Sequence, residues 1–267
     1  MKKLVIYLAL IVTGFSACKK IIDIDVDNAE PQIVIEGKIT NRTIDQQILI
    51  SKTVGYDEKG IYPKVTGAVV TVTDNRGNTF AFTERSPGVY IRRMRGVSGV
   101  TYSLDITAEG KNYKASSTMP AFVPIDSIGV ITNSFFGNER KTAAAFLKDP
   151  ADQKNYYHFN LYVNNIFSKR IYVNDDRLTN GNNLRIQLYN ESDDDDDDTG
   201  LKSGDSISIE AECIDANIFN YWYALSSQAG RGPNQGTTPS NPTSNISNNA
   251  LGYFSAHTYQ KLDATVK

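Results

Sequence analysis

Short β-forming runs, separated at regular intervals by turn residues, dominate the chain from residue 32 onward. In the first part they cover residues 32–39, 47–51, 67–73, 79–83, 89–91, 102–108 and 113–117. Residues 74–78 and 86–88 supply the Asp, Asn, Gly and Pro residues that favour tight turns between such runs. Evenly spaced short strands with turns between them are typical of two packed antiparallel sheets. The sequence therefore predicts an immunoglobulin-like β-sandwich over residues 31–119.

A second β-rich region follows a proline linker at residues 120–125. Pro120 and Pro124 exclude a central strand there, because proline cannot donate a ladder hydrogen bond. Residues 126–267 contain further β-forming runs, of which the aromatic run at 156–163 is the strongest. We expect this region to form a β-rich domain that is sandwich-like or barrel-like.

One main α-helix is predicted near residues 215–228. Ile218, Tyr221, Trp222 and Leu225 recur there at helical spacing, and Asp215 can cap the first turn. The chain as a whole is therefore predicted to be mostly β, with two β-rich domains and one main helix.

The amino terminus has the pattern of a secretory signal. Lys2 and Lys3 precede an apolar run at residues 4–12, which is too short to span a bilayer as a helix. The following Phe-Ser-Ala-Cys sequence resembles a bacterial lipoprotein box, in which the cysteine receives a lipid and becomes the first residue. We therefore expect a signal peptide at 1–17, a lipidated Cys18 that anchors the protein to a membrane, and a tether at 18–30. The alternative is an ordinary signal peptide with a chance cysteine.

Three acids at the start of the tether bear on which face of the membrane the protein occupies. Asp23, Asp25 and Asp27 resemble the surface-export signals of Bacteroidota lipoproteins, although they lie farther from the cysteine than is usual. A solvated tether explains them equally well. The expected location is the outer membrane, with the cell surface and the periplasmic face both left open.

Composition excludes several functional classes. With 28 basic and 30 acidic residues the net charge is -2, so a nucleic-acid partner is not expected. Two cysteines cannot make a disulfide scaffold, and Cys213, in an alternating run, is expected to be a buried apolar residue. The chain has two histidines, His158 and His257, which leaves little material for a histidine-built metal site or a catalytic relay.

Aromatic residues of the second region are candidate ligand-binding groups. Exposed rings of Tyr157, Tyr221 and Trp222 could stack on a flat ligand. The alternative is core packing, because the helix spacing and the strand run also fit buried faces. Within the run at 156–163, alternation places Phe159, Leu161 and Val163 on one face.

Six consecutive aspartates at residues 193–198 form the candidate metal site. Asp193, Asp195 and Asp197 offer the hard oxygen ligands that suit Ca²⁺. The spacing departs from a calcium-binding loop, because Ser206 stands where a bidentate glutamate is expected. The alternative is a solvated acidic loop, and apart from this possible calcium ion no cofactor is expected.

Several short motifs resemble one family of Bacteroidota lipoproteins. They are the lipoprotein start, residues 34–37, 67–70, 88–90 and 203–205, the Tyr221-Trp222 helix, and residues 241–254. The order of these motifs is similar to that of the family catalogued as domain of unknown function 4249. This resemblance implies an outer-membrane lipoprotein that accompanies TonB-dependent transporters, and the family has no assigned catalytic residues.

The leading functional hypothesis is a non-enzymatic accessory or ligand-binding subunit beside an outer-membrane transporter or assembly, with a TonB-dependent barrel as a possible partner. A surface hydrolase acting on glycans or peptides and a purely structural subunit are the alternatives. Neither a Gly-x-Ser-x-Gly elbow nor a His-Glu-x-x-His motif occurs in the sequence. Two carboxyl groups about 5 to 9.5 Å apart in a cleft would favour a glycosidase.

Overall fold

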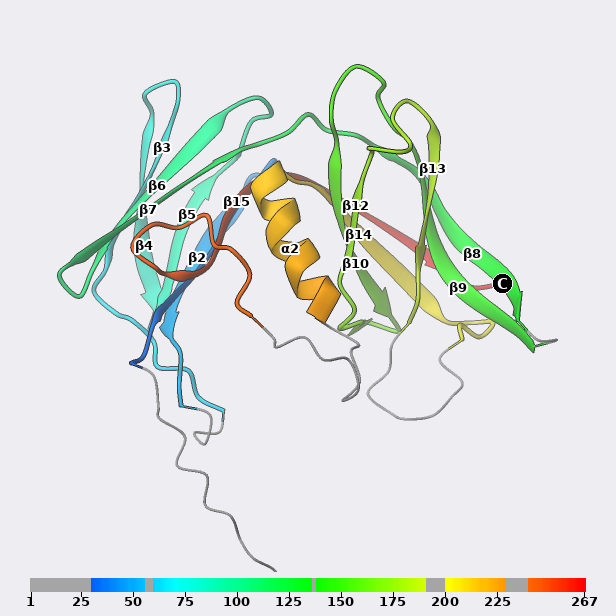
Figure 1. Ribbon diagram of the computed structural model, residues 1–267, viewed down its shortest axis with the longest axis horizontal. Helices are drawn as coiled ribbons and strands as arrows, with labels where there is room; N and C mark the ends of the chain where they lie inside the picture. Colours follow the sequence, from blue (N-terminus) through cyan, green and yellow to red (C-terminus); the bar gives the residue numbers. More distant parts are fainter. Residues whose placement is uncertain (1–29, 56–59, 136–137, 191–199, 229–239) are drawn as a thin grey trace, which may run out of the picture.

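The computed structural model describes residues 30–55, 60–135, 138–190, 200–228 and 240–267. These residues form a mostly β protein with a large sheet, a smaller sheet and the helix α2, which confirms the predicted fold class. Figure 1 shows two β-rich halves, with α2 lying between them. Among the described residues, no helix combines the length and the apolar character needed to cross a membrane.

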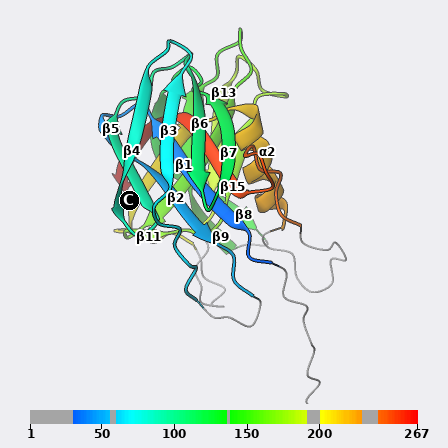
Figure 2. The same cartoon turned by 90° about the vertical axis from the view of Figure 1, so that its left-hand side faces the viewer.

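The first half contains seven strands in an antiparallel path. They are β1 (Ile33–Thr40), β2 (Ile44–Lys52), β3 (Val69–Asp74), β4 (Thr79–Ser86), β5 (Val89–Met94), β6 (Thr101–Ala108) and β7 (Lys111–Thr118). Their order in the sheet is β1-β2-β5-β4-β3-β6-β7, and several of them are visible side by side in Figure 2. The immunoglobulin-like assignment of this half stays a prediction.

The strand β4 divides this half into two layers. Thr79 to Phe82 pair with β3, whereas Thr83 to Ser86 pair with β5, and the register shifts between Glu84 and Ser86. Alternate apolar residues from both parts, such as Ile48 and Leu104, therefore meet in one buried core. Among the described residues no disulfide contributes to this core, and Cys213 is free and buried elsewhere.

The second half packs two sheets face to face. Its strands are β8 (Ile125–Phe135), β9 (Asn138–Lys148), β10 (Tyr156–Val163), β11 (Ile166–Phe167), β12 (Tyr172–Asp175), β13 (Asn183–Leu188) and β14 (Ser206–Cys213). The order β13-β9-β8 forms one sheet, and β11-β10-β14 continue the large sheet. Leu147 and Leu184 of the small sheet and Phe159, Leu161 and Ile209 of the large one share a second buried core.

The strand β15 (Leu251–Thr265) joins the two halves. Its first part pairs in parallel with β1, from Leu251 to His257, and its second part pairs antiparallel with β14, from Thr258 to Thr265. Phe254 accordingly belongs to the first core. The last segment of the chain thus contributes to both halves. The domain bounds of 31–119 and 126–267 stay predictions.

Gly252 of β15 lies against the backbone of β1 at Ile35. It has a φ of 90°, and a Cβ atom there would lie 2.0 Å from the carbonyl oxygen of Ile35. Gly252→Ala is expected to lower the free energy of unfolding by about 2 to 4 kcal/mol, from the positive φ and the steric overlap together. Chemical denaturation measures the change.

Gly110→Ala is the matched control for this substitution. Gly110 also has a positive φ, 74°, but no atom lies within 4 Å of a Cβ placed there. Its replacement should cost only about 1 kcal/mol, the backbone part of the effect. Equal losses in the two variants would contradict the role given to the β1–β15 contact.

The helix α2 (Ala216–Gln228) agrees with the helix predicted near 215–228. Asp215 caps it, because its Oδ1 accepts hydrogen bonds from the backbone N–H of Asn217 at 2.9 Å and of Ile218 at 3.0 Å. Ile218 and Phe219 are buried and pack with Tyr253 of β15 in a third apolar cluster. Ser117 of β7 donates a hydrogen bond to Oδ2 of Asp215, so the cap also links α2 to the first half.

Candidate functional site

A cleft of about 350 Å³ lies beside the point where β15 passes from one half to the other. Its walls come from β1, β10, β11, β14, β15 and α2, so both halves contribute side chains to it. It includes both histidines of the chain, His158 and His257. Other pockets exist at the surface, but this one brings together the most ionisable and aromatic groups.

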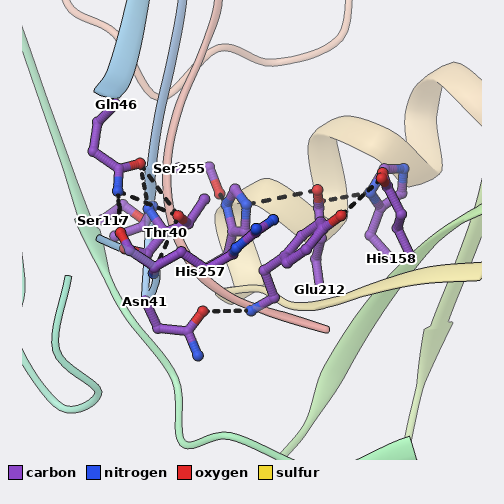
Figure 3. Close-up of polar contacts among 12 residues, drawn as sticks. Thr40, Asn41, Gln46, Ser117, His158, Glu212, Ser255 and His257 are labelled. Carbon is purple, nitrogen blue, oxygen red and sulfur yellow. Dashed lines mark hydrogen bonds and ion pairs between the residues drawn. The ribbon is translucent and has the colours of Figure 1, made fainter. Parts of the chain in front are cut away.

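The floor of the cleft is a buried carboxylate between two imidazoles (Figure 3). Oε2 of Glu212 lies 2.8 Å from Nδ1 of His158, and Oε1 of Glu212 lies 3.6 Å from Nε2 of His257. The three residues are 5%, 3% and 1% exposed. The two histidines, which lie far apart in the sequence, therefore share one partner.

Strand register brings these three residues together. His158 of β10 lies directly opposite Glu212 of β14. On the other side of β14, Glu212 lies opposite Tyr259 of β15, and His257 is two residues earlier on the same face. Direct and diagonal cross-strand neighbours are within reach of long side chains, so the register accounts for both contacts.

Glu212 is ionised in this environment. Burial works against its charge, but the His257 and His158 imidazoles and the Lys38 ammonium outweigh that penalty and hold its pKa below the usual range. Because an ionised carboxylate can only accept hydrogen bonds, Nδ1 of His158 is the donor in their contact.

His257 is held mainly in its neutral form. Burial lowers the pKa of its imidazole, and the repulsion from Lys38 and His158 acts in the same direction, while Glu212 and Asp215 oppose it. Below pH 6.5, the ordinary pKa of a histidine imidazole, the unfolded state therefore binds more protons than the folded state.

Stability is accordingly expected to fall as the pH is lowered from 7.5 to 5.5. The contribution of His257 to the free energy of unfolding is complete above pH 6.5. Below that pH it decreases by at most about 1.4 kcal/mol per pH unit. The lowered pKa of Glu212 adds a second loss only below its ordinary value of 4.5. Urea denaturation at several pH values tests this, and His257→Gln should flatten the slope between pH 7.5 and 5.5. An unchanged slope in that variant would show that His257 does not cause it.

The residue types of a hydrolase triad occur here, in Ser255, His257 and Glu212, but their geometry is not that of a triad. Ser255 Oγ lies 2.9 Å from Nδ1 of His257, whereas the carboxylate approaches Nε2. In serine hydrolases the acid orients Nδ1 and the nucleophile pairs with Nε2. Ser255 is also only 2% exposed, so its hydroxyl is not presented to a substrate.

Trp222 forms the aromatic wall of the cleft. Its indole stacks on the His158 ring, with centroids 4.7 Å apart and planes 10° apart. Tyr221, the preceding residue of α2, packs on Tyr253, with centroids 5.0 Å apart, and burial raises its pKa to about 12. The helix thus places Trp222 in the cleft and Tyr221 against β15.

Tyr157 lies apart from the other two candidate aromatics. It points to the opposite face of β10, is 2% exposed, and donates a hydrogen bond to Asp149 in the second core. Burial, followed by the hydrogen bond to Asp149, raises its pKa well above the ordinary value. Of the three candidates, Trp222 alone lines the cleft.

The outer part of the cleft is organised around Glu210. Its carboxylate accepts hydrogen bonds from the hydroxyls of Tyr259 at 2.7 Å and of Tyr162 at 3.3 Å. The Arg42 guanidinium lies 5.0 Å from the Tyr259 ring centroid, and the Lys261 ammonium lies 5.7 Å from that of Tyr162. Burial and the bond to Glu210 raise the pKa of Tyr259.

The metal and lipid predictions fall on other parts of the chain. Asp193, Asp195, Asp197 and Cys18 lie outside the described residues, so the calcium and lipidation hypotheses stay predictions. Within the described ranges, no group of three or more His, Cys, Asp or Glu side chains is arranged to hold a metal ion.

The fold and the cleft define a β-rich protein whose halves share a strand and enclose a polar and aromatic cleft between them. A search of curated proteins finds no match to the sequence. Residues 19–263 match the model of the family described as domain of unknown function (DUF4249). The chain belongs to this family, as its motif order predicts.

Proposed function

We propose that the protein is a lipid-anchored outer-membrane lipoprotein that serves as a non-catalytic accessory or ligand-binding subunit of a transporter or other membrane assembly. The lipid on Cys18 holds it at the membrane, and the cleft between the halves receives the ligand. The partner is a TonB-dependent barrel, which the motif order of the sequence suggests.

The pairing of both carboxylates of the cleft with neighbouring side chains carries this proposal. Glu212 is held by His158 and His257, and Glu210 by two tyrosine hydroxyls. A general acid needs a raised pKa, whereas that of Glu212 is lowered. Aromatic rings and a few polar groups in a concave site are the usual composition of a binding pocket.

The test is recovery of the partner from the membrane. The protein, tagged after Lys267, is extracted from its own membranes in mild detergent and captured, and co-purifying proteins are identified by mass spectrometry. We expect a TonB-dependent barrel in stoichiometric amount. Recovery of the monomer alone would contradict the proposal.

A surface hydrolase is the second candidate, because Glu210 and Glu212 both line the cleft from one face of β14. Two carboxylates flanking a substrate are the machinery of most glycosidases. Release of reducing sugar from oligosaccharides by the wild type, lost in Glu210→Gln, would favour this function over the binding role. No release by either protein is the result that the proposed function expects.

A further inference from the structure

The cleft offers unpaired polar groups of two kinds. Lys38 and Asn160, both half-buried, line it, and among the described residues neither side chain has a hydrogen-bond or ion-pair partner. Lys38 donates only, and the Asn160 amide both donates and accepts. Glu210 supplies acceptor oxygens with capacity left beyond its two tyrosine bonds. A ligand must therefore both accept and donate hydrogen bonds at neighbouring positions.

The charges around the cleft disfavour an ionic ligand of either sign. An anion that reached Lys38 would lie beside Glu212 and Glu210, the first of which is ionised. A cation that reached Glu210 would meet Arg42 and Lys261, which already occupy the faces of its two tyrosine partners. Like charges at such distances repel, and more strongly in a partly buried cleft than in water. The electrostatic balance favours an uncharged ligand.

One side of the cleft is apolar and aromatic. The rings of Tyr162 and Phe167 lie 5.3 Å apart, and Phe167, on the short strand β11, is 47% exposed. Trp222 faces the same space from α2. Aromatic faces of this kind pack against the C–H face of a ring while the polar edge of the ligand meets the opposite wall.

We propose that this cleft binds a neutral sugar, an inference that rests on the ligand-binding role proposed above. A hydroxyl group both donates and accepts, which matches the mixture of Lys38, Asn160 and Glu210. The volume of about 350 Å³ is at the lower end of the roughly 300–1,000 Å³ found for small-molecule sites. The cleft thus takes a small unit of one or two rings, with the exposed ring of Phe167 as the stacking platform.

The test uses the full protein, purified in a detergent whose head group contains no sugar. Maltose, cellobiose, lactose, mannobiose and xylobiose are the neutral probes, and glucuronate and glucosamine are the charged ones. Titration calorimetry measures binding, and the fluorescence of Trp222, the single tryptophan of the chain, reports on the cleft itself. We expect saturable binding of at least one neutral probe and weaker binding of both charged probes. Binding of no neutral probe, or stronger binding of a charged one, would overturn the proposal.

Variants locate the binding to the cleft. Glu210→Gln and Asn160→Ala are each expected to weaken binding about tenfold, through the loss of one hydrogen bond in a partly buried site. Glu139→Gln and Asn183→Ala, at exposed positions on other strands, are the matched controls and should bind as the wild type does. Phe167→Ala removes an exposed ring, so it tests the platform in a protein whose core is intact. Unchanged affinity in all three cleft variants would contradict the site.

The outcome is separable from that of the proposed function. A barrel partner recovered from the membrane without any sugar binding would overturn the sugar inference alone. Sugar binding without a membrane partner would overturn the accessory role while supporting the cleft as a sugar site.

Discussion

Replacing Glu212 with alanine is expected to lower the free energy of unfolding by about 2 to 4 kcal/mol, because it leaves a buried donor without an acceptor and creates a cavity. The carboxylate is 5% exposed and is the shared partner of His158 and His257. Its removal leaves Nδ1–H of His158 without an acceptor and opens space where β10, β14 and β15 meet. Both effects act at the junction of the two halves.

Urea denaturation at pH 7.5, followed by far-ultraviolet circular dichroism, measures the loss. Glu139→Ala is the control, because Glu139 is exposed on β9 and its replacement should change stability by no more than about 0.5 kcal/mol. If Glu212→Ala loses less than about 1 kcal/mol, the His-Glu-His group does not stabilise the junction. Two separate transitions in the variant would indicate that the halves then unfold independently.

Local patterns in the sequence predicted the individual elements well. The aromatic run at 156–163 is β10 with the same limits, and the helix predicted from Ile218, Tyr221 and Trp222 is α2, capped by Asp215. These features depend on side-chain period and on capping, which neighbouring residues determine. Residues 141–146, where no local pattern favours one element, form the middle of β9, and tertiary packing decides the outcome there.

The same local patterns do not predict which strands pair over long sequence distances. The strand β15 runs to Thr265 and changes partner after His257, and no local pattern in the sequence indicates either feature. A parallel pairing with β1 joins segments more than 200 residues apart, and no local signal encodes it. Gly252 was part of a recognised motif, but its positive φ and its contact with Ile35 appear only in the folded chain.

The alternation of side chains along each strand predicts part of the cleft from the sequence. Placing Phe159, Leu161 and Val163 on one face of β10 puts Tyr157 on that face too, and His158 on the opposite one. The same rule places Glu210 and Glu212 together on β14. What alternation does not give is the register between β10, β14 and β15, so the meeting of both histidines at Glu212 required the structure.

Replacing Cys18 with alanine is expected to move the protein from the membrane fraction to the soluble fraction. A diacylated cysteine inserts two hydrocarbon chains, which is enough for stable anchoring, and each buried methylene contributes about 0.8 kcal/mol. The loss of anchoring is measured by ultracentrifugation of lysed cells and by incorporation of labelled palmitate.

Cys213→Ala is the matched control, because Cys213 is the other cysteine of the chain and is buried in the second core. It should keep both the label and the membrane location, at a modest cost in stability for the smaller side chain. A wild type that is exported but soluble and unlabelled would instead support an ordinary signal peptide with a chance cysteine. That result would also overturn the membrane-anchored role, while the cleft between the halves could still bind its ligand in free solution.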